Sequence, residues 1–482
     1  MRRRRLLAVV AAAATVASLG AATGGTPLAL AGPAAAKPAA AKLVAASASA
    51  AVAVRPGVIP LKATPLSAPP TTAQCEAQLK IACYQPFQLR QAYGLPKLYA
   101  KGIDGAGQTI MIVDPFGSPT IGQDLATFDR SFHIPAPPSL KIIQPAGKVP
   151  PYQPTGTRIN WAFETTLDVE YSHMVAPDAN ILLVETPISE TEGTGGFPQI
   201  VKAEEFVIQH HLGDVISQSF GATEQSFATA QALLRLRTPY VQAAAAGITV
   251  LASTGDDGVA NVHRFGNDFF LHPTINWPDS DPLVTAVGGT QLHLNAAGKR
   301  TDPDNVWNDT FNVNAQKIFE GNPGPNPLAT GGGKSAIFLR PSYQAGVAGA
   351  TGNRRGVPDI SMSAACDGSV IIHVGFKGLP AGFTEVCGTS EAAPLFAGIV
   401  ALADQAAGHP LGVINPALYV MLAHHNSGLV DVKEGNNTVS FSQGGKEHTI
   451  TGFAAGPGYD LASGVGTIFA PDFVPALART AG

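Results

Sequence analysis

The sequence predicts an α/β domain with a mostly parallel central sheet and helices on both of its faces. Short apolar segments that suit buried strands alternate along the chain with helical segments, and this alternation is typical of a parallel sheet covered on both sides. Hydrophobic residues make up 45% of the 482 residues, enough to supply a large core. Charged residues are scarce at 14%, whereas 52 glycines and 39 prolines indicate a loop-rich globular chain rather than a coiled coil.

Nearly continuous apolar runs mark the expected strands, because a strand that is buried on both faces has no polar side. The expected strands lie at residues 108–114, 180–185, 214–221, 247–253 and 283–287. The expected helices lie at residues 87–93, 157–174, 197–210, 228–245 and 395–403. Ordered structure is expected to begin near Cys83.

The N-terminal residues have the pattern of an export signal. A basic stretch at residues 2–5 precedes an apolar stretch at residues 6–22, and small residues that suit a cleavage site follow. We therefore expect a signal peptide over residues 1–31, with an uncleaved membrane anchor as the alternative. Residues 32–72 are rich in Ala, Pro and Ser and are expected to form a low-complexity linker or a residual propeptide, followed by one domain over residues 73–482.

Charge and hydropathy argue against two classes of partner. The net charge is −4 and no basic cluster lies beyond the N-terminus, so the charge pattern does not indicate a nucleic-acid-binding surface. No later stretch is long and apolar enough to cross a membrane. We expect a secreted, extracellular protein that acts as a monomer.

The four cysteines favour two disulfides, because an exported chain folds in an oxidising compartment. Cys75 and Cys83 are close in the sequence, and so are Cys366 and Cys387. These two pairings are our hypothesis. The second would tether the loop that precedes Ser390.

The sequence Gly388-Thr389-Ser390 stands before an apolar helical run at residues 395–403. A serine at the mouth of a buried helix suits a nucleophile, because free N–H groups of the first helical turn can stabilise negative charge. Pro394 fits a place in that first turn, where a residue has no helical N–H bond to lose. A simple helix-capping serine is the alternative interpretation.

Three acidic residues are candidates to work with this serine. Glu164 and Asp168 are four residues apart on an expected helix, so they share one face among apolar and aromatic neighbours. Asp256 follows an expected strand, at the edge of a parallel sheet where ligands bind. The alternatives are a solvated acidic face for the pair and an ordinary turn residue for Asp256. None of the twelve histidines is followed by glycine, so a base of the His-Gly-Thr kind is not indicated.

From Cys83 to Gly482 the chain resembles the sedolisin family of serine-carboxyl peptidases. The resemblance rests on the Glu164-x-x-x-Asp168 helix and on a series of motifs in the same order along the chain. These motifs are Ser219-Phe220-Gly221, Thr254-Gly255-Asp256, Val287-Gly288-Gly289-Thr290, Gly331-Gly332-Gly333-Lys334-Ser335, Pro341-Ser342-Tyr343-Gln344, Val357-Pro358-Asp359-Ile360-Ser361, Gly388-Thr389-Ser390 with Pro394, and Asn415-Pro416-Ala417-Leu418-Tyr419. The resemblance implies a subtilisin-like fold.

The same resemblance implies a role for each candidate. Ser390 would be the nucleophile, Glu164 its general base and Asp168 the group that orients Glu164. Asp256 would be the acid of the oxyanion hole, which must be protonated to donate a hydrogen bond.

The C-terminal segment is similar to the calcium loop of the family. Asp431 and Asp460 would provide carboxylates, and Val432, Gly456 and Gly458 would provide backbone carbonyls to one structural Ca²⁺. A glycine-rich turn without an ion is the alternative.

The predicted function is that of a secreted serine-type endopeptidase, active at acid pH on protein or peptide substrates. It would act through an acyl-enzyme on Ser390 with a glutamate base. Two alternatives stay open at this point: an exported non-catalytic binding protein on the same fold, and an ordinary subtilisin-type serine protease.

Overall fold

The computed structural model describes residues 59–61, 65–189, 194–263, 268–318, 325–424 and 427–482. The expected signal peptide and the first part of the expected linker, up to residue 58, lie outside the described residues. The predicted domain boundaries therefore stay predictions.

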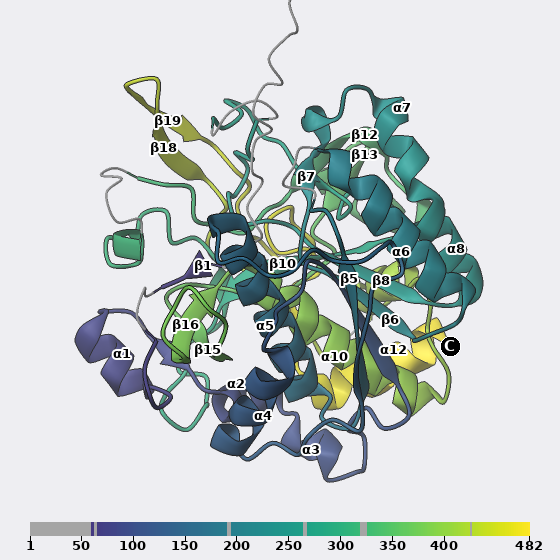
Figure 1. Ribbon diagram of the computed structural model, residues 1–482. Coiled ribbons are helices and arrows are strands. Elements are labelled where there is room, and N and C mark those ends of the chain that lie inside the picture. Colours follow the sequence, from purple (N-terminus) through teal and green to yellow (C-terminus); the bar gives the residue numbers. More distant parts are fainter. Residues whose placement is uncertain (1–58, 62–64, 190–193, 264–267, 319–324, 425–426) are drawn as a thin grey trace, which may run out of the picture. The chain divides into compact units, whose positions relative to one another are not determined.

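An eight-stranded sheet forms the centre of the fold, as the sequence predicted (Figure 1). Its strands follow the order β11-β10-β8-β6-β3-β5-β4, and β14 pairs with β10 in addition. All of these pairings are parallel except that of β11 with β10. The strands are β3 (Thr109–Pro115), β4 (Leu140–Ile143), β5 (Asn180–Thr186), β6 (Val215–Gln218), β8 (Thr249–Ser253), β10 (Thr285–Gln291), β11 (Asn305–Val306) and β14 (Ile360–Ser363).

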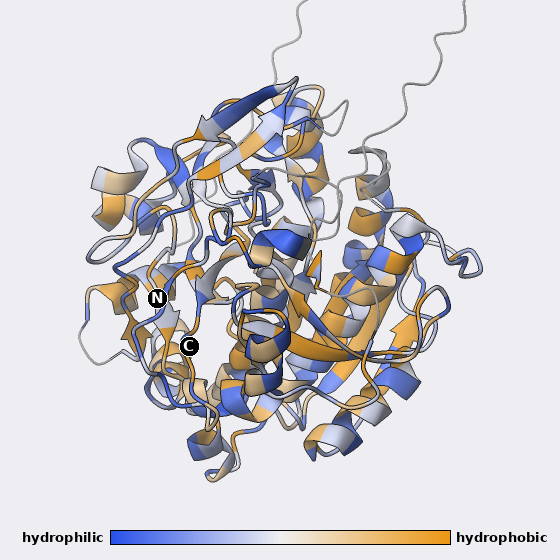
Figure 2. Cartoon of the chain, turned by 90° about the vertical axis from the view of Figure 1, so that its left-hand side faces the viewer, coloured by the Kyte–Doolittle hydropathy of each residue, from blue (hydrophilic) through white to orange (hydrophobic). Residues whose placement is uncertain are grey.

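Two apolar cores lie on the two faces of this sheet. Alternate residues of β3 show the division, because Ile110 and Ile112 belong to one core and Met111 and Val113 to the other. The central strands are accordingly hydrophobic along their length (Figure 2). The first core is covered by α4 (Ile121–Phe132), α5 (Gly156–Val175), α10 (Thr389–Ala407) and α12 (Ala470–Ala481), and the second by α6 (Phe197–Gln209) and α8 (Thr238–Ala246).

A second sheet of four strands leads into α10, and the sequence did not predict it. Its order is β1-β16-β15-β2, with β16 central and directly before α10. Ile59 of β1 pairs with Cys387 of β16, so ordered structure begins before Cys83, where we expected it. The strands are β1 (Ile59–Pro60), β2 (Cys83–Tyr84), β15 (Ser369–Val374) and β16 (Gly382–Cys387).

Two expected elements differ from the structure. The helix expected at 228–245 is divided into α7 (Ala230–Leu234), a 3-10 turn at Arg235–Arg237 and α8, which has Pro239 in its first turn. The strand expected at 214–221 is paired only from Val215 to Gln218, and the residues after it turn into the site described below.

The remaining elements are short and lie around these layers. The helices are α1 (Thr72–Gln78), α2 (Pro86–Tyr93), α3 (Pro96–Tyr99), α9 (Ala348–Thr351) and α11 (Asn415–Leu422), with 3-10 turns at Thr194–Gly196, Glu224–Ser226, Ala315–Ile318 and Ser342–Val347. The strands are β7 (Ala222–Thr223), β9 (Asn276–Trp277), β12 (Gly333–Leu339), β13 (Arg354–Val357), β17 (Leu429–Val430), β18 (Val439–Gln443), β19 (Lys446–Ile450) and β20 (Thr467–Ile468).

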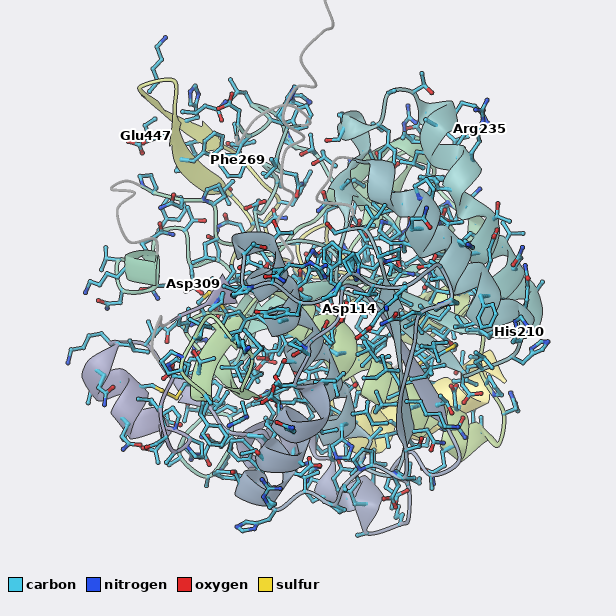
Figure 3. All side chains as sticks on the ribbon, viewed as in Figure 1. Asp114, His210, Arg235, Phe269, Asp309 and Glu447 are labelled. Atoms are coloured by element: carbon cyan, nitrogen blue, oxygen red, sulfur yellow. A yellow bond between two sulfur atoms is a disulfide. The ribbon has the colours of Figure 1, made fainter. Side chains whose placement is uncertain are left out.

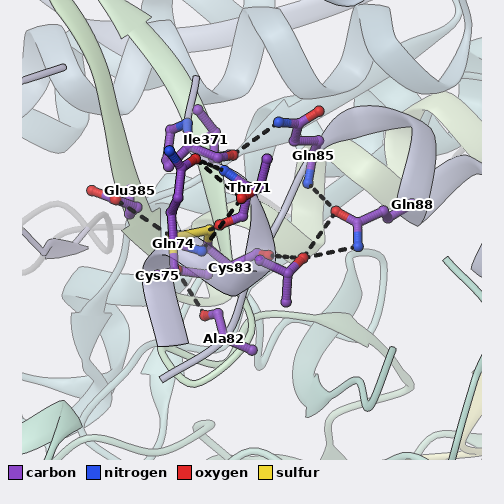
Figure 4. Close-up of a disulfide and its surroundings, with 12 residues drawn as sticks. Thr71, Gln74, Cys75, Ala82, Cys83, Gln85, Gln88, Ile371 and Glu385 are labelled. Carbon is purple, nitrogen blue, oxygen red and sulfur yellow. Dashed lines mark hydrogen bonds between the residues drawn. A yellow bond between two sulfur atoms is a disulfide. The ribbon is translucent and has the colours of Figure 1, made fainter. Parts of the chain in front are cut away.

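Both predicted disulfides are confirmed. Cys75 is bonded to Cys83, which joins α1 to β2 (Figure 4). Cys366 is bonded to Cys387, three residues before Ser390. None of the helices in the described part of the chain has the length and apolar character needed to span a bilayer.

Candidate active site

Ser390 lies in the first turn of α10, directly after a tight turn at Gly388. The φ angle of Gly388 is +123°, a conformation that favours glycine. The Ser390 hydroxyl is buried and makes no hydrogen bond within the described residues. A capping serine would accept a hydrogen bond from its own helix, so this hydroxyl is not acting as a cap.

Asp256 contacts the residue next to Ser390. Its Oδ1 accepts hydrogen bonds from the backbone N–H of Thr389 at 2.7 Å and from the Thr389 hydroxyl at 2.8 Å. The N–H of Gly255 donates to the same hydroxyl at 3.0 Å. Asp256 is therefore tied to the mouth of α10 rather than to its own turn, which removes the turn-residue alternative.

The carboxyl of Asp256 favours the protonated form. Burial raises its pKa to about 8, and the two hydrogen bonds from Thr389 oppose that increase. Its second oxygen, Oδ2, is buried and has no hydrogen-bond partner among the described residues. A proton on Oδ2 would make this atom a donor that stands free beside the Ser390 turn.

Glu164 and Asp168 are completely buried on α5, so the solvated-face alternative is wrong. The hydroxyl of Ser219, just after β6, donates to Oδ1 of Asp168 at 2.8 Å. Burial raises the pKa of Asp168 well above its ordinary value, and the nearby carboxyls of Asp114 and Glu164 raise it further. These effects all favour the protonated form of Asp168.

The packing of α5 along α10 brings the acidic pair level with Ser390. The contact is close at Gly398, where an added Cβ would lie 3.1 Å from the carbonyl oxygen of Ser172. Gly398 follows Ser390 by about two helical turns, and Ser172 follows Glu164 by the same interval. Ser390 in the first turn of α10 is therefore level with the third turn of α5, which carries Glu164 (Figure 1).

Asp114 belongs to this group, although the sequence analysis did not single it out. It lies at the end of β3 in the interior of the molecule (Figure 3), and its carboxyl is fully buried. Burial raises its pKa to about 7, and the hydroxyl of Thr165 on α5 opposes the increase. The available signal was an acid at the end of an otherwise apolar strand, the same signal that identified Asp256.

Pro394 does not lie where we expected it. Because α10 begins at Thr389, Pro394 falls in the second turn and not in the first. A proline there has no N–H to donate to the carbonyl four residues earlier, which is that of Ser390. The regular backbone hydrogen bond to the carbonyl of Ser390 is therefore missing from α10.

The expected calcium ligands converge on one glycine loop. Gly458 N–H donates to both carboxylate oxygens of Asp431, at 3.2 and 3.1 Å, and Gly456 N–H donates to Oδ2 of Asp460 at 3.1 Å. Burial raises the pKa of Asp460, and backbone N–H bonds oppose this. Two carboxylates that face one glycine loop are compatible with the expected Ca²⁺ site, and the ion and its carbonyl ligands, including that of Val432, stay predictions.

Comparison with known proteins gives matches over most of the chain. The profile described as the subtilase family matches residues 159–445. Kumamolisin of Bacillus sp. (strain MN-32) is 32% identical over 394 residues, which cover 80% of this chain and 62% of kumamolisin. Sedolisin of Pseudomonas sp. (strain 101) is 32% identical over 281 residues, which cover 58% of this chain and 43% of sedolisin. The chain thus spans about two fifths to three fifths of the length of these relatives.

A solved structure shares the fold. It is that of Pseudomonas sedolisin, a serine-carboxyl proteinase, in complex with two molecules of pseudo-iodotyrostatin. The TM-score is 0.65 at 24% sequence identity, and the match covers 83% of this chain and 100% of that chain. The likeness agrees with the expected arrangement of a parallel sheet between helices.

Proposed function

The chain belongs to the subtilase family, and within it to the sedolisins; from that premise we propose that it is a secreted serine-carboxyl peptidase that hydrolyses peptide bonds at acid pH. The observation that carries the proposal is the position of Ser390. Its hydroxyl is buried and has no hydrogen-bond partner among the described residues, and the residue beside it is held by the carboxyl of Asp256, whose pKa is raised by burial.

The first step uses Glu164 as general base. Ser390 Oγ attacks the substrate carbonyl carbon while its proton passes to the Glu164 carboxylate, and the carbonyl electrons move onto oxygen. Asp168 keeps its own proton because of burial and its acidic neighbours, and that proton can be shared with Glu164. Because the Asp168 carboxyl is then uncharged, Glu164 can ionise without placing two negative charges next to each other.

The developing oxyanion is stabilised by Asp256 and by the positive end of α10. Asp256 donates its Oδ2 proton as a hydrogen bond, which an ionised carboxylate could not do. The intermediate then collapses: the C–N bond breaks, Glu164 returns its proton to the leaving amine, and an ester forms on Ser390. Water hydrolyses the ester by the same steps, again with Glu164 as base.

These requirements favour activity at acid pH. Glu164 must be ionised to accept the serine proton. Asp256 must be protonated, and burial raises its pKa to about 8. Activity should therefore rise as Glu164 loses its proton and fall as Asp256 loses its own.

A bound Ca²⁺ would supply a divalent charge that holds the C-terminal loop together. Its ligands would be the carboxylates of Asp431 and Asp460 with the carbonyls of Val432, Gly456 and Gly458. We propose that this ion stabilises the structure and takes no part in catalysis.

Substitution of Ser390 tests the function. Purified parent chain is expected to cleave casein at pH 5 and to be about 10-fold slower at pH 9, where most of Asp256 is ionised, and Ser390→Ala should lose activity by a factor on the order of 10⁶ while keeping its near-ultraviolet circular dichroism. Ser442→Ala, at an exposed serine of β18, is the matched control and should keep full activity. A folded parent chain that cleaves at neither pH would favour a non-catalytic binding protein, and greater activity at pH 9 than at pH 5 would favour an ordinary subtilisin mechanism.

A further inference from the structure

Glu391 is a buried acid that the mechanism above does not use. It directly follows Ser390 in the first turn of α10 and has no exposed surface. Neither carboxyl oxygen makes a well-aligned hydrogen bond with the described residues. Burial of an unpaired carboxyl is costly, so the presence of one next to the nucleophile calls for an explanation.

The residues around Ser390 are each attached to a neighbouring strand end. Cys387 is bonded to Cys366 through the disulfide, and Gly388 N–H donates to the carbonyl of Ala364 at 2.8 Å. Thr389 is held from the other side by Asp256. Within the described part of the chain, the hydroxyl of Ser390 has no such attachment. These contacts form a clamp on the turn before the helix.

Glu391 extends this clamp into the helix. The Ser363 hydroxyl, at the end of β14, is close enough to the Glu391 carboxyl to lower its pKa, although it is not aligned for a regular hydrogen bond. Ser363, Ala364 and Cys366 are nearly consecutive, so one short segment that begins at the last residue of β14 contacts Glu391, Gly388 and Cys387.

The surroundings of Glu391 favour a neutral carboxyl. The titratable side chains that sense its charge are Tyr93 of α2 and Tyr171 of α5, and neither is a cation. Beyond Tyr93, Arg300 forms an ion pair with Asp304 and is already neutralised. Burial raises the pKa of Glu391 well above its ordinary value.

We propose that Glu391 is a positioning residue for Ser390, which packs the first turn of α10 against Ser363 as an uncharged carboxylic acid. This inference rests on the proposed peptidase function. A charged carboxylate at this place would cancel the positive end of the helix dipole and repel the oxyanion that forms beside Ser390. The neutral acid fills the space and leaves that positive end free to act on the substrate.

The test compares two variants, one in which the Glu391 side chain is removed and one in which it is replaced by an uncharged side chain of the same size. Glu391→Ala is expected to lower kcat by about 10- to 100-fold, because a small misplacement of a reacting atom has effects of this size, and to leave KM nearly unchanged. Glu391→Gln keeps the size and shape of the side chain but cannot become negatively charged, and its kcat should stay within about 3-fold of the parent value.

Glu204 is a matched control. It is also a fully buried glutamate whose carboxyl lacks partners in the described part of the chain, but it lies on α6, in the core of the opposite face. Glu204→Ala should destabilise the fold as Glu391→Ala does, yet leave kcat within about 2-fold of the parent value. Equal effects of the two alanine substitutions on kcat would overturn a positioning role, and so would a Glu391→Gln variant as slow as Glu391→Ala.

Two further measurements keep the outcome decisive. If Glu391→Ala fails to fold, Ser363→Ala removes the facing hydroxyl instead, and a kcat that is then unchanged would overturn the proposal. Labelling of Ser390 by a fluorophosphonate, followed by intact mass, reports on the serine without peptide cleavage. A folded parent chain that neither cleaves peptides nor is labelled refutes the proposed function itself, whereas an active parent with an unaffected Glu391→Ala refutes only the role of Glu391.

Discussion

Gly398 of α10 lies directly against Val175 of α5, so closely that a Cβ on Gly398 would come within 2.5 Å of the Val175 Cβ. Real Cβ atoms do not approach so closely, so any larger residue must separate the two helices. Because these helices carry Ser390 and the Glu164–Asp168 pair, their spacing also sets the spacing of the candidate catalytic groups.

Gly398→Ala should therefore reduce activity without touching the site. Overpacking of this kind costs about 1–3 kcal/mol of unfolding free energy, and a shift of the helices should lower kcat by at least about 10-fold. Denaturant unfolding and steady-state kinetics measure the two effects. Gly122→Ala in α4 is the control, because an added Cβ meets nothing within 4 Å there and should be neutral or slightly stabilising. Parent-like kcat in Gly398→Ala would show that helix spacing does not limit the reaction.

Asp256→Asn should flatten the alkaline side of the pH–activity profile. The parent chain is expected to lose activity as the Asp256 carboxyl, with its pKa of about 8, gives up its proton. An amide donates at every pH, so the variant should be slower at the optimum through imperfect geometry but lose proportionately less as the pH rises. The measurement is kcat/KM from pH 3 to pH 9 for both proteins. Superimposable alkaline limbs, or a parent optimum at or above neutrality, would count against Asp256 as the oxyanion donor.

Removal of Ca²⁺ should destabilise the fold. An ion that binds only the native state adds about 2.7 kcal/mol at a hundred times its Kd, so a chelator should lower Tm by at least about 2 °C. Differential scanning calorimetry with and without chelator measures this. Asp431→Asn should abolish the dependence on Ca²⁺, whereas Asp472→Asn, at an exposed aspartate of α12, should preserve it. No shift with chelator in a protein from which the metal was demonstrably removed would contradict the site.

Unfolding free energy should decrease as the pH rises from about 4 to about 8. Asp114, Asp256 and Asp404 have pKa values raised to about 7, 8 and 8, with burial as the main cause. In the unfolded chain an aspartate loses its proton near pH 3.9, so the native state binds more protons across this range. The stabilisation is complete below the pKa that these aspartates have in the unfolded chain, and it is lost as the pH rises toward their pKa in the folded chain. The unfolding free energy falls by about 1.4 kcal/mol per pH unit for each proton that the native state retains.

Urea unfolding at pH 4, 6 and 8 measures this dependence. Asp404→Asn removes one such group far from Ser390, since Asp404 lies near the C-terminal end of α10, and it should reduce the slope without changing the pH profile of activity. Greater stability of the parent at pH 8 than at pH 4 would reverse the expected sign.

Local sequence patterns determined much of the fold and of the candidate site of this protein. The alternation of apolar strands and helices predicted the parallel sheet, because strands that are buried on both faces cannot contain polar positions. The Gly388-Thr389-Ser390 sequence before an apolar run predicted a serine at the mouth of a buried helix, and Ser390 does lie in the first turn of α10. The nearness of the cysteines in the sequence was enough to suggest both disulfides, since short loops close easily.

The second sheet and the partners of the buried acids were decided only by tertiary structure. The pairing of Ile59 with Cys387 joins residues that are distant in the sequence, and no local propensity indicates such a pairing. Burial raises the pKa values of Asp114 and Glu391, because the desolvation of a carboxylate depends on what packs around it and not on its sequence neighbours. The sequence alone named Ser390, Glu164, Asp168 and Asp256 as candidates, but the contact of Asp256 with Thr389 and the approach of α5 to α10 at Gly398 exist only in the folded chain.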